Sequence, residues 1–225
     1  MNQTISRQTQ SRRDLLAVYL CGSFLGDGYL LGGSGDADLV MIYSVPPDEG
    51  GEIIQVSEDF LLDISHRDES EYRDTRSLRV DPWLGPEINT CRVLYDPQHF
   101  MDFVQASVRG QFERPDHVYR RAKAFAELGR AGWAGLLNGT IGAPRAASGY
   151  LQSVGLALNA VASLGGPPMT ERRLMLDFSQ RAEDMGEPGL YKGLLGLLGA
   201  SKVSAEQIAG WRADWAKAFQ AVQGK

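Results

Sequence analysis

The sequence changes character near Pro115, and this change limits the folds that the chain can adopt. Before Pro115, short apolar runs alternate with segments rich in Gly, Pro and Asp, a pattern that predicts strands joined by turns. After it, Ala, Leu and long polar residues repeat at helical spacing between breaks of Gly and Pro. We therefore predict an α+β fold with two domains, in which a small mixed β-sheet over residues 1–114 precedes a C-terminal helical bundle over residues 115–225.

Local patterns predict the individual elements. The predicted strands are at 15–21, 38–44, 60–65 and 92–95. Asp96 and Pro97 supply an N-cap and a favoured first-turn proline, so a helix is expected from 97 to 112. Near the C-terminus, large apolar residues repeat at i+3 and i+4, at Ile208, Trp211, Trp215, Phe219 and Val222. This spacing is typical of ordinary packing, so we expect the stripe to face the core of the helical half.

Composition excludes several classes of protein. With 225 residues, of which 43% are hydrophobic, the chain can bury a core without covalent cross-links. Cys21 and Cys91 are therefore expected to be reduced thiols of a cytoplasmic protein. The net charge of -5 lacks the basic surplus of nucleic-acid-binding proteins, which argues against nucleic acid as a partner. No run reaches the ~20 apolar residues of a membrane span.

The N-terminus offers a competing interpretation. The Ser-Arg-Arg motif at 11–13, followed by an apolar run, imitates a twin-arginine export signal. However, bulky Tyr19 and Leu20 precede Cys21, where lipoprotein cleavage requires small residues, and no A-x-A-like site follows. We therefore favour a cytoplasmic protein over an exported lipoprotein.

A D-x-D motif, formed by Asp36 and Asp38, opens the second predicted strand. Side chains alternate between the faces of a strand, so the two carboxylates are predicted to point the same way, in line with Val40 and Ile42. Magnesium prefers hard oxygen ligands and is commonly held by one or two carboxylates together with substrate phosphates. The motif therefore predicts a Mg²⁺ site for phosphate chemistry.

Gly22 and Ser23 follow the first predicted strand directly. A glycine lets the backbone approach a phosphate closely, while a serine hydroxyl and nearby N–H groups can donate to its oxygens. The G-K-[ST] sequence of a P-loop does not occur in the chain, which excludes a Walker-type site. The pair predicts a phosphate contact at the end of the first strand.

The order of strand, Gly22-Ser23, loop, D-x-D and apolar strand resembles the signature of the nucleotidyltransferase superfamily with the polymerase-β fold. Within it, the chain looks most like the aminoglycoside nucleotidyltransferases and their relatives, clearly over residues 15–112. The resemblance implies that Asp36 and Asp38 bind metal, that Gly22 and Ser23 hold nucleotide phosphate, and that a third carboxylate comes from a later strand.

The remaining site residues are assigned from this resemblance. Asp63 is the candidate for the third carboxylate, because it is the one acid in the middle of the strand-like run at 60–65. Asp59, on the same alternating face, is the alternative. The family carries serine directly before the D-x-D, whereas this chain has Gly35 there, so Ser34 is the candidate for that nucleotide contact.

The resemblance implies a magnesium-dependent enzyme that moves a nucleotide, with AMP from ATP as the expected group, to a hydroxyl of a small acceptor such as an aminoglycoside-like compound. The helical half would bind and cap the acceptor. A second class stays open, namely a non-catalytic NTP-binding regulator or antitoxin-like partner on the same fold. The acceptor, the base preference and the oligomeric state are not fixed by the sequence.

Overall fold

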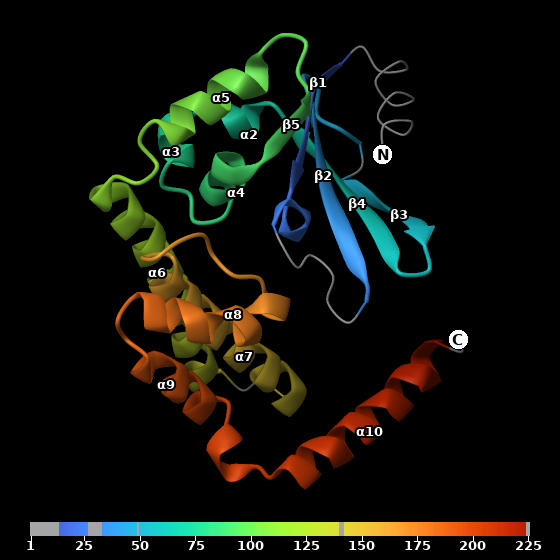
Figure 1. The fold of residues 1–225 in the computed structure, drawn as a ribbon, viewed down its shortest axis with the longest axis vertical. Helices are drawn as coiled ribbons and strands as arrows, with labels where there is room; N and C mark the ends of the chain where they lie inside the picture. The colour runs from blue at the N-terminus through green and yellow to red at the C-terminus, as the bar shows by residue number, and fades with distance from the viewer. Residues whose placement is uncertain (1–13, 27–32, 49, 140–141, 224–225) are drawn as a thin grey trace.

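The computed structural model describes residues 14–26, 33–48, 50–139 and 142–223, and it confirms the α+β class (Figure 1). The Ser-Arg-Arg motif at 11–13 lies outside the described residues. The strands are β1 (Leu15–Cys21), β2 (Gly35–Tyr43), β3 (Gly51–Ser57), β4 (Phe60–Asp68) and β5 (Arg92–Tyr95). Relative to the prediction, β2 begins three residues earlier and β4 continues to Asp68.

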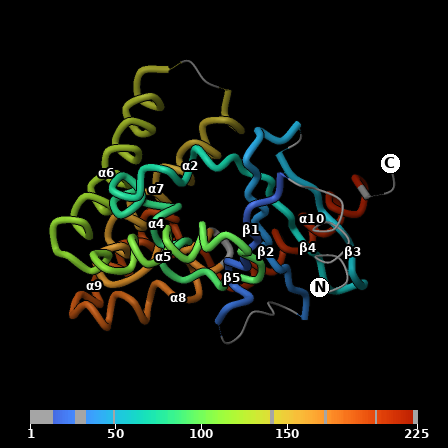
Figure 2. Tube along the Cα trace, turned by 90° about the horizontal axis from the view of Figure 1, so that it is seen from above, coloured from blue at the N-terminus to red at the C-terminus, as the bar shows by residue number. Residues whose placement is uncertain are grey.

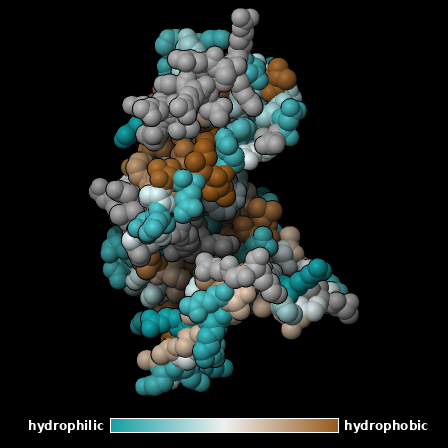
Figure 3. Space-filling model, turned by 90° about the vertical axis from the view of Figure 1, so that its right-hand side faces the viewer, coloured by the Kyte–Doolittle hydropathy of each residue, from teal (hydrophilic) through white to brown (hydrophobic). Residues whose placement is uncertain are grey.

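The five strands form one mixed sheet in the order β3-β4-β2-β1-β5. β2 and β4 are parallel, and the other neighbouring pairs are antiparallel. β3 was not predicted from the sequence. It is an edge strand with many exposed polar positions, and its hydrophobic Ile53 and Val56 are themselves exposed. Figure 3 views the side on which β3 lies, and hydrophobic side chains gather there at the level of the sheet.

Helices α2 (Ser70–Arg73), α3 (Thr75–Leu78), α4 (Leu84–Thr90) and α5 (Phe100–Arg109) lie together on one side of the sheet (Figures 1 and 2). They bury the sheet face that carries Tyr19, Val40 and Ile42. Leu20, Leu39 and other residues of alternate positions belong to a second buried cluster on the opposite face. The alternation of side chains along β1 and β2 therefore divides the core between the two faces.

α5 begins at Phe100, three residues later than the predicted start at 97. His99 adopts a left-handed conformation with φ of 57°, so regular helix cannot run through it. Asp96 still caps the helix, because its carboxylate accepts hydrogen bonds from the N–H groups of Phe100 and Asp102 at 2.9 and 2.8 Å. The short helices α2, α3 and α4 were also absent from the prediction, since four to seven residues give little periodicity.

The helical half contains α6 (Pro115–Asn138), α7 (Ala143–Ala162), α8 (Glu171–Asp184), α9 (Gly189–Leu197) and α10 (Ala205–Gln223). One cluster of its buried residues, which includes Leu158, Phe178 and Leu194, is formed mostly by α7, α8 and α9. None of the helices in the described part of the chain is long and apolar enough to cross a bilayer. α6 begins at Pro115, while the division into two domains there stays a prediction from the sequence.

The apolar stripe near the C-terminus does not face a core, and this part of the prediction was wrong. α10 extends from the helical half to below the sheet, and none of its described side chains is buried (Figure 1). Ile208, Trp211, Trp215, Phe219 and Val222 are exposed by 48 to 73%. Helical spacing puts these side chains on one face of a helix, but it does not determine whether another element covers that face.

Candidate active site

Asp38 and Asp63 are direct neighbours across the parallel pair β2 and β4, where they lie in register. Because paired residues of adjacent strands point to the same face, both carboxylates rise on the face covered by α2–α5. Asp36 lies two residues before Asp38 on that face, close to the start of β2. Across the antiparallel pair with β1, the partner of Asp38 is Cys21, the last residue of that strand. The structure thus brings all three predicted aspartates to one end of the sheet.

Gly22 lies directly against the carboxylate of Asp38. A Cβ placed at Gly22 would lie 1.8 Å from Oδ2 of Asp38, a separation that no side chain can occupy. Gly22 also has a positive φ of 75°, which favours glycine. After it the chain turns into the short 3-10 helix η1 (Ser23–Leu25). The predicted phosphate contact and the predicted metal ligands are therefore adjacent.

The surroundings of Asp38 raise the pKa of its carboxyl to about 6. Burial is the largest cause, because it disfavours the charged form, and the negative charges of Asp36, Asp63 and Glu87 add to it. Several carboxylates thus share a partly dry corner in which their mutual repulsion favours binding of a cation. A carboxyl whose pKa is raised by burial and by neighbouring carboxylates is unusual in a structural surface cluster and typical of functional sites.

Asp36, Asp38 and Asp63 are the candidate ligands of a metal ion. Among the described residues, no group of three or more His, Cys, Asp or Glu side chains is already arranged around a common point for a metal ion. Mg²⁺ does not require such a group, because it is usually held by one or two carboxylates together with phosphate oxygens and water. Asp36 and Asp38, with Asp63 beside them, fit this type of binding.

Ser34 and Asp59 lie at the edge of this corner. Ser34 is exposed immediately before β2, and residues 27–32 lie outside the described residues. Asp59 lies in the turn before β4, where its carbonyl accepts a hydrogen bond from the N–H of Gly35 at 2.9 Å. Asp59 therefore fixes the start of β2 through its backbone, whereas Asp63 offers a carboxylate beside Asp38.

A buried polar network, which the sequence analysis missed, lies beneath the aspartates on the same face. The hydroxyl of Tyr19 donates to Oε1 of Glu87 at 2.5 Å and lies 2.8 Å from the hydroxyl of Tyr72. Arg67 forms an ion pair with Glu87 at 3.2 Å. Burial raises the pKa of both tyrosines, so both stay protonated. These residues come from β1, β4, α2 and α4, and no short motif links them.

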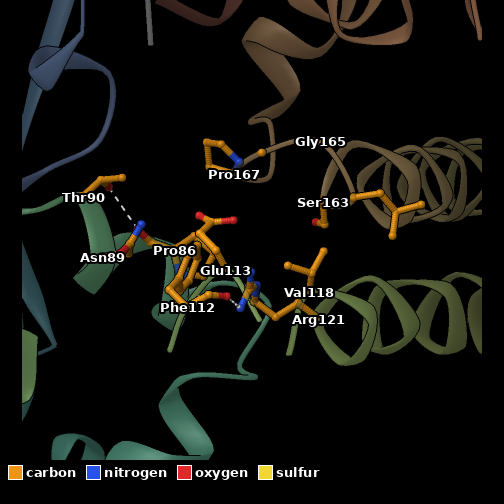
Figure 4. Close-up of a pocket in the computed structure, with 12 residues that line it drawn as sticks. Pro86, Asn89, Thr90, Phe112, Glu113, Val118, Arg121, Ser163, Gly165 and Pro167 are labelled. Atoms are coloured by element: carbon orange, nitrogen blue, oxygen red, sulfur yellow. Dashed lines mark hydrogen bonds between the residues drawn. The ribbon is translucent and has the colours of Figure 1, made fainter. Parts of the chain in front are cut away.

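Two pockets lie near the junction of the sheet and the helices. The first, of about 390 Å³, borders η1 through Leu25 and includes Arg92 and Arg109. The second, of about 300 Å³, is lined by α4, the start of α6 and the segment after α7 (Figure 4). Thr90 lines both, so the two pockets are neighbours.

The second pocket has a polar lining built around Arg121. Its guanidinium lies over the ring of Phe112 at 3.7 Å and donates to the carbonyl oxygens of Arg79 and Phe112. The hydroxyl of Ser163, on the opposite wall, is buried and has no hydrogen-bond partner among the described residues. A buried hydroxyl without a partner is costly, so the pocket is suited to a polar ligand.

No protein-family model and no curated protein matches the chain. Among solved structures, the chain is similar to a nucleotidyltransferase-like protein from Exiguobacterium sibiricum 255-15, with a TM-score of 0.40 and 14% sequence identity. The similarity covers 86% of this chain and 66% of the other, so this chain spans slightly less than two thirds of that protein. A likeness at this level carries no information on activity.

Proposed function

We propose that the chain is a magnesium-dependent nucleotidyltransferase that moves a nucleotide, with ATP as donor, to a hydroxyl of a small molecule. The observation that carries the proposal is the in-register pair of Asp38 and Asp63, with Gly22 against the carboxylate of Asp38. Metal-binding carboxylates beside a glycine-serine turn are what transfer of a nucleotide requires, because the donor phosphates must be both neutralised and positioned.

In this proposal Asp36 and Asp38 hold the metal, and Gly22 and Ser23 hold the donor phosphates. Bound Mg²⁺ would neutralise the charge of the triphosphate and align it for attack. The absence of a side chain at Gly22 lets the backbone approach a phosphate oxygen, and the Ser23 hydroxyl is available to donate to it. Arg92, which is exposed in the pocket beside η1, supplies positive charge for the phosphates.

Asp63 is assigned to the acceptor side of the reaction. As the neighbour of Asp38, it can take the proton of the attacking hydroxyl or contribute a third oxygen ligand. The oxygen of the acceptor forms a bond to the α-phosphorus while the bond to the β-phosphate oxygen breaks, and pyrophosphate leaves with its electron pair. In this assignment Asp36 and Asp38 hold the metal that aligns the triphosphate, and Asp63 deprotonates the acceptor hydroxyl.

The pocket of Figure 4 is the proposed acceptor site. It lies between the sheet half and the helical half, and Thr90 lines both this pocket and the pocket beside η1. Its Ser163 hydroxyl and the Asn89 amide can each form hydrogen bonds with a hydroxylated ligand, and exposed Glu113 favours a cationic group. A small polar molecule with hydroxyl and amino groups is therefore the expected acceptor.

The test measures pyrophosphate release with Mg²⁺, each of the four NTPs, and a panel of aminoglycosides and other small hydroxylated compounds. The Asp36→Asn/Asp38→Asn double variant removes the charges and keeps the side-chain shape, while Asp59→Asn removes the acid that was the alternative to Asp63 and that contacts β2 through its backbone. Release that is lost in the double variant and kept in Asp59→Asn supports the proposal. NTP binding without release from any acceptor points to the regulator class, and release by the double variant refutes the assignment.

A further inference from the structure

The stripe of α10 leaves a large hydrophobic surface open. This stripe, formed by Ile208, Trp211, Trp215, Phe219 and Val222, includes two tryptophans that are 59 and 65% exposed. From the size of large side chains, the stripe exposes on the order of 500 Å² of apolar surface. Within the described residues nothing covers it. Patches of this size on one helix mark sites of interaction.

The first turn of α10 is fixed by a cap of its own. Ser204 N–H donates to Oε1 of Gln207 at 2.9 Å, and the N–H of Gln207 donates to Oγ of Ser204 at 3.2 Å. This reciprocal pair is a capping box, which sets the first turn of a helix. Only residues 203 and 204 separate α10 from the preceding 3-10 helix η2 (Ala200–Lys202). The cap and the short link direct α10 away from α6–α9 (Figure 1).

The same chain exposes an apolar groove that suits such a stripe. This groove, here called the α6–α7 groove, has a volume of about 530 Å³ and is lined by Ala126, Gly129 and Trp133 of α6, Ala157 and Val161 of α7, and Leu197 of α9. Trp133 and Leu197 are themselves 46 and 55% exposed. Small residues between larger apolar ones leave room for an inserted aromatic ring.

One wall of the α6–α7 groove is held firmly. The Tyr150 hydroxyl donates to the carbonyl oxygen of Leu197 at 2.8 Å, which ties α7 to the end of α9. The rings of Tyr150 and Trp133 are in contact, with centroids 5.7 Å apart. The groove is therefore formed before a partner arrives, so that binding does not have to order it.

We propose that the occupant of the α6–α7 groove is α10 of a second copy of the chain, and that two copies exchange these helices about a twofold axis. A twofold arrangement covers both stripes and both grooves at once, which a single copy in this conformation leaves open. The two stripes together bury roughly 1,000 Å², and the two grooves bring the total to about 1,300 Å², which lies within the lower part of the size range of stable interfaces.

The charges of α10 favour a protein partner over a membrane surface. Away from the stripe the helix carries Glu206 and Asp214 as well as Arg212 and Lys217, and Lys217 lies 3.8 Å from Asp214. Helices that bind anionic membranes have a polar face dominated by Lys and Arg. The balanced charges of α10 lack this property, and they match the rim of a protein interface.

The first test measures the mass of the full chain in solution by light scattering. A dimer of twice 24.6 kDa, about 49 kDa, is expected. Trp211→Glu/Trp215→Glu places charges in the stripe and should give a monomer with unchanged circular dichroism. Ala213→Glu adds a charge to the opposite, exposed face of α10 and should stay dimeric. A monomeric wild-type chain, or a double variant that stays dimeric, would overturn the proposal.

The second test identifies the surfaces that meet. Cys21 and Cys91 are buried, so an engineered surface thiol is the one that reacts. Trp215→Cys and Ala157→Cys place thiols on the stripe and in the groove, and both positions are exposed. When the two single variants are mixed and oxidised, a disulfide between the two chains is expected. A dimer that forms no such disulfide uses another face. If one chain that carries both Trp215→Cys and Ala157→Cys forms the disulfide within itself, α10 closes its own groove. Either result contradicts the proposal.

Discussion

The carboxylate of Asp38 occupies the space that a side chain at Gly22 would need, since a Cβ there would lie 1.8 Å from Oδ2 of Asp38. The backbone at Gly22, directly after β1, is thus in contact with the carboxylate of Asp38. Ser23, which follows Gly22, is placed beside the aspartates by the same turn. The shape of the candidate site therefore depends on a residue that has no functional group of its own.

Gly22→Ala should damage activity more than stability. Gly22 has φ of 75° and ψ of -160°, a region that essentially only glycine adopts, so alanine costs about 1–3 kcal/mol there, and the added methyl group must displace either Asp38 or the turn. A displacement of about 1 Å at a reacting centre can lower kcat/KM roughly 100-fold. Gly26→Ala is the matched control, because its φ is -109° and its nearest contact would be at 3.8 Å. Steady-state kinetics on both variants decide the matter, and similar activities would contradict the assigned role of Gly22.

The raised pKa of Asp38 predicts how activity depends on pH. Metal and nucleotide require the ionised carboxylate, and the pKa of this group is about 6 in the absence of ligands. Activity and Mg²⁺ affinity should therefore fall as the pH drops through about 6, and higher Mg²⁺ concentrations should move the midpoint to lower pH. A profile of kcat/KM against pH, flat between pH 5 and pH 8, would contradict this expectation.

In the absence of metal, the raised pKa of Asp38 makes the folded chain less stable at high pH, whereas activity is lost at low pH. The Asp38 carboxyl binds its proton more tightly in the folded chain than in the unfolded one. Its contribution to stability is therefore fully present below the ordinary carboxyl pKa and is lost as the pH rises through about 6. Asp38→Asn should raise the free energy of unfolding at pH 8 by about 1 kcal/mol, after allowance for solvent screening, and should have little effect at pH 4. Urea denaturation at the two pH values, in the presence of a chelator, measures the difference.

Tyr19→Phe should destabilise the sheet beneath the site. The substitution removes the hydroxyl that joins Glu87 and Tyr72, and leaves the Glu87 carboxylate with one bond fewer beside Arg67. Loss of a buried hydrogen bond to a charged group costs about 1–3 kcal/mol. Tyr119→Phe removes a hydroxyl from an exposed side chain and should change the free energy of unfolding little. Equal stabilities of the two variants would show that the network does not support the fold.

Arg92→Ala should weaken binding of the NTP. Arg92 is exposed in the pocket that borders η1, where it can pair with phosphate oxygens. A charge-assisted hydrogen bond to phosphate is worth about 1.5–3 kcal/mol, so KM for the NTP should rise at least tenfold. Arg92→Lys keeps the positive charge, so its KM for the NTP should rise less than that of Arg92→Ala. An unchanged KM in Arg92→Ala would place the triphosphate elsewhere.

The sequence was informative where local chemistry and strand alternation act together. The two faces of β2 and the position of Asp63 in a strand follow from side-chain alternation alone. The pairing of Asp38 with Asp63 does not, because register depends on which strands become neighbours. The network of Tyr19 and Glu87 was invisible for the same reason, since its members lie 68 positions apart.

The remaining errors have separate physical causes. β3 is an edge strand whose exposed Ile53 and polar neighbours obscure the alternation that marks a half-buried strand. The helix expected at 97 starts later, because His99 takes a left-handed conformation that only the folded turn imposes. The stripe of α10 obeys the helical period, but burial depends on a partner surface that the period cannot encode.

The most direct test of the proposed function is calorimetric titration of the wild-type chain and of Asp36→Asn/Asp38→Asn with an NTP, with and without Mg²⁺. We expect the wild type to bind the NTP in the presence of Mg²⁺, and we expect binding to be lost on removal of the metal or of the two charges. Equal binding by the wild type and the variant, or binding that does not depend on Mg²⁺, would contradict it.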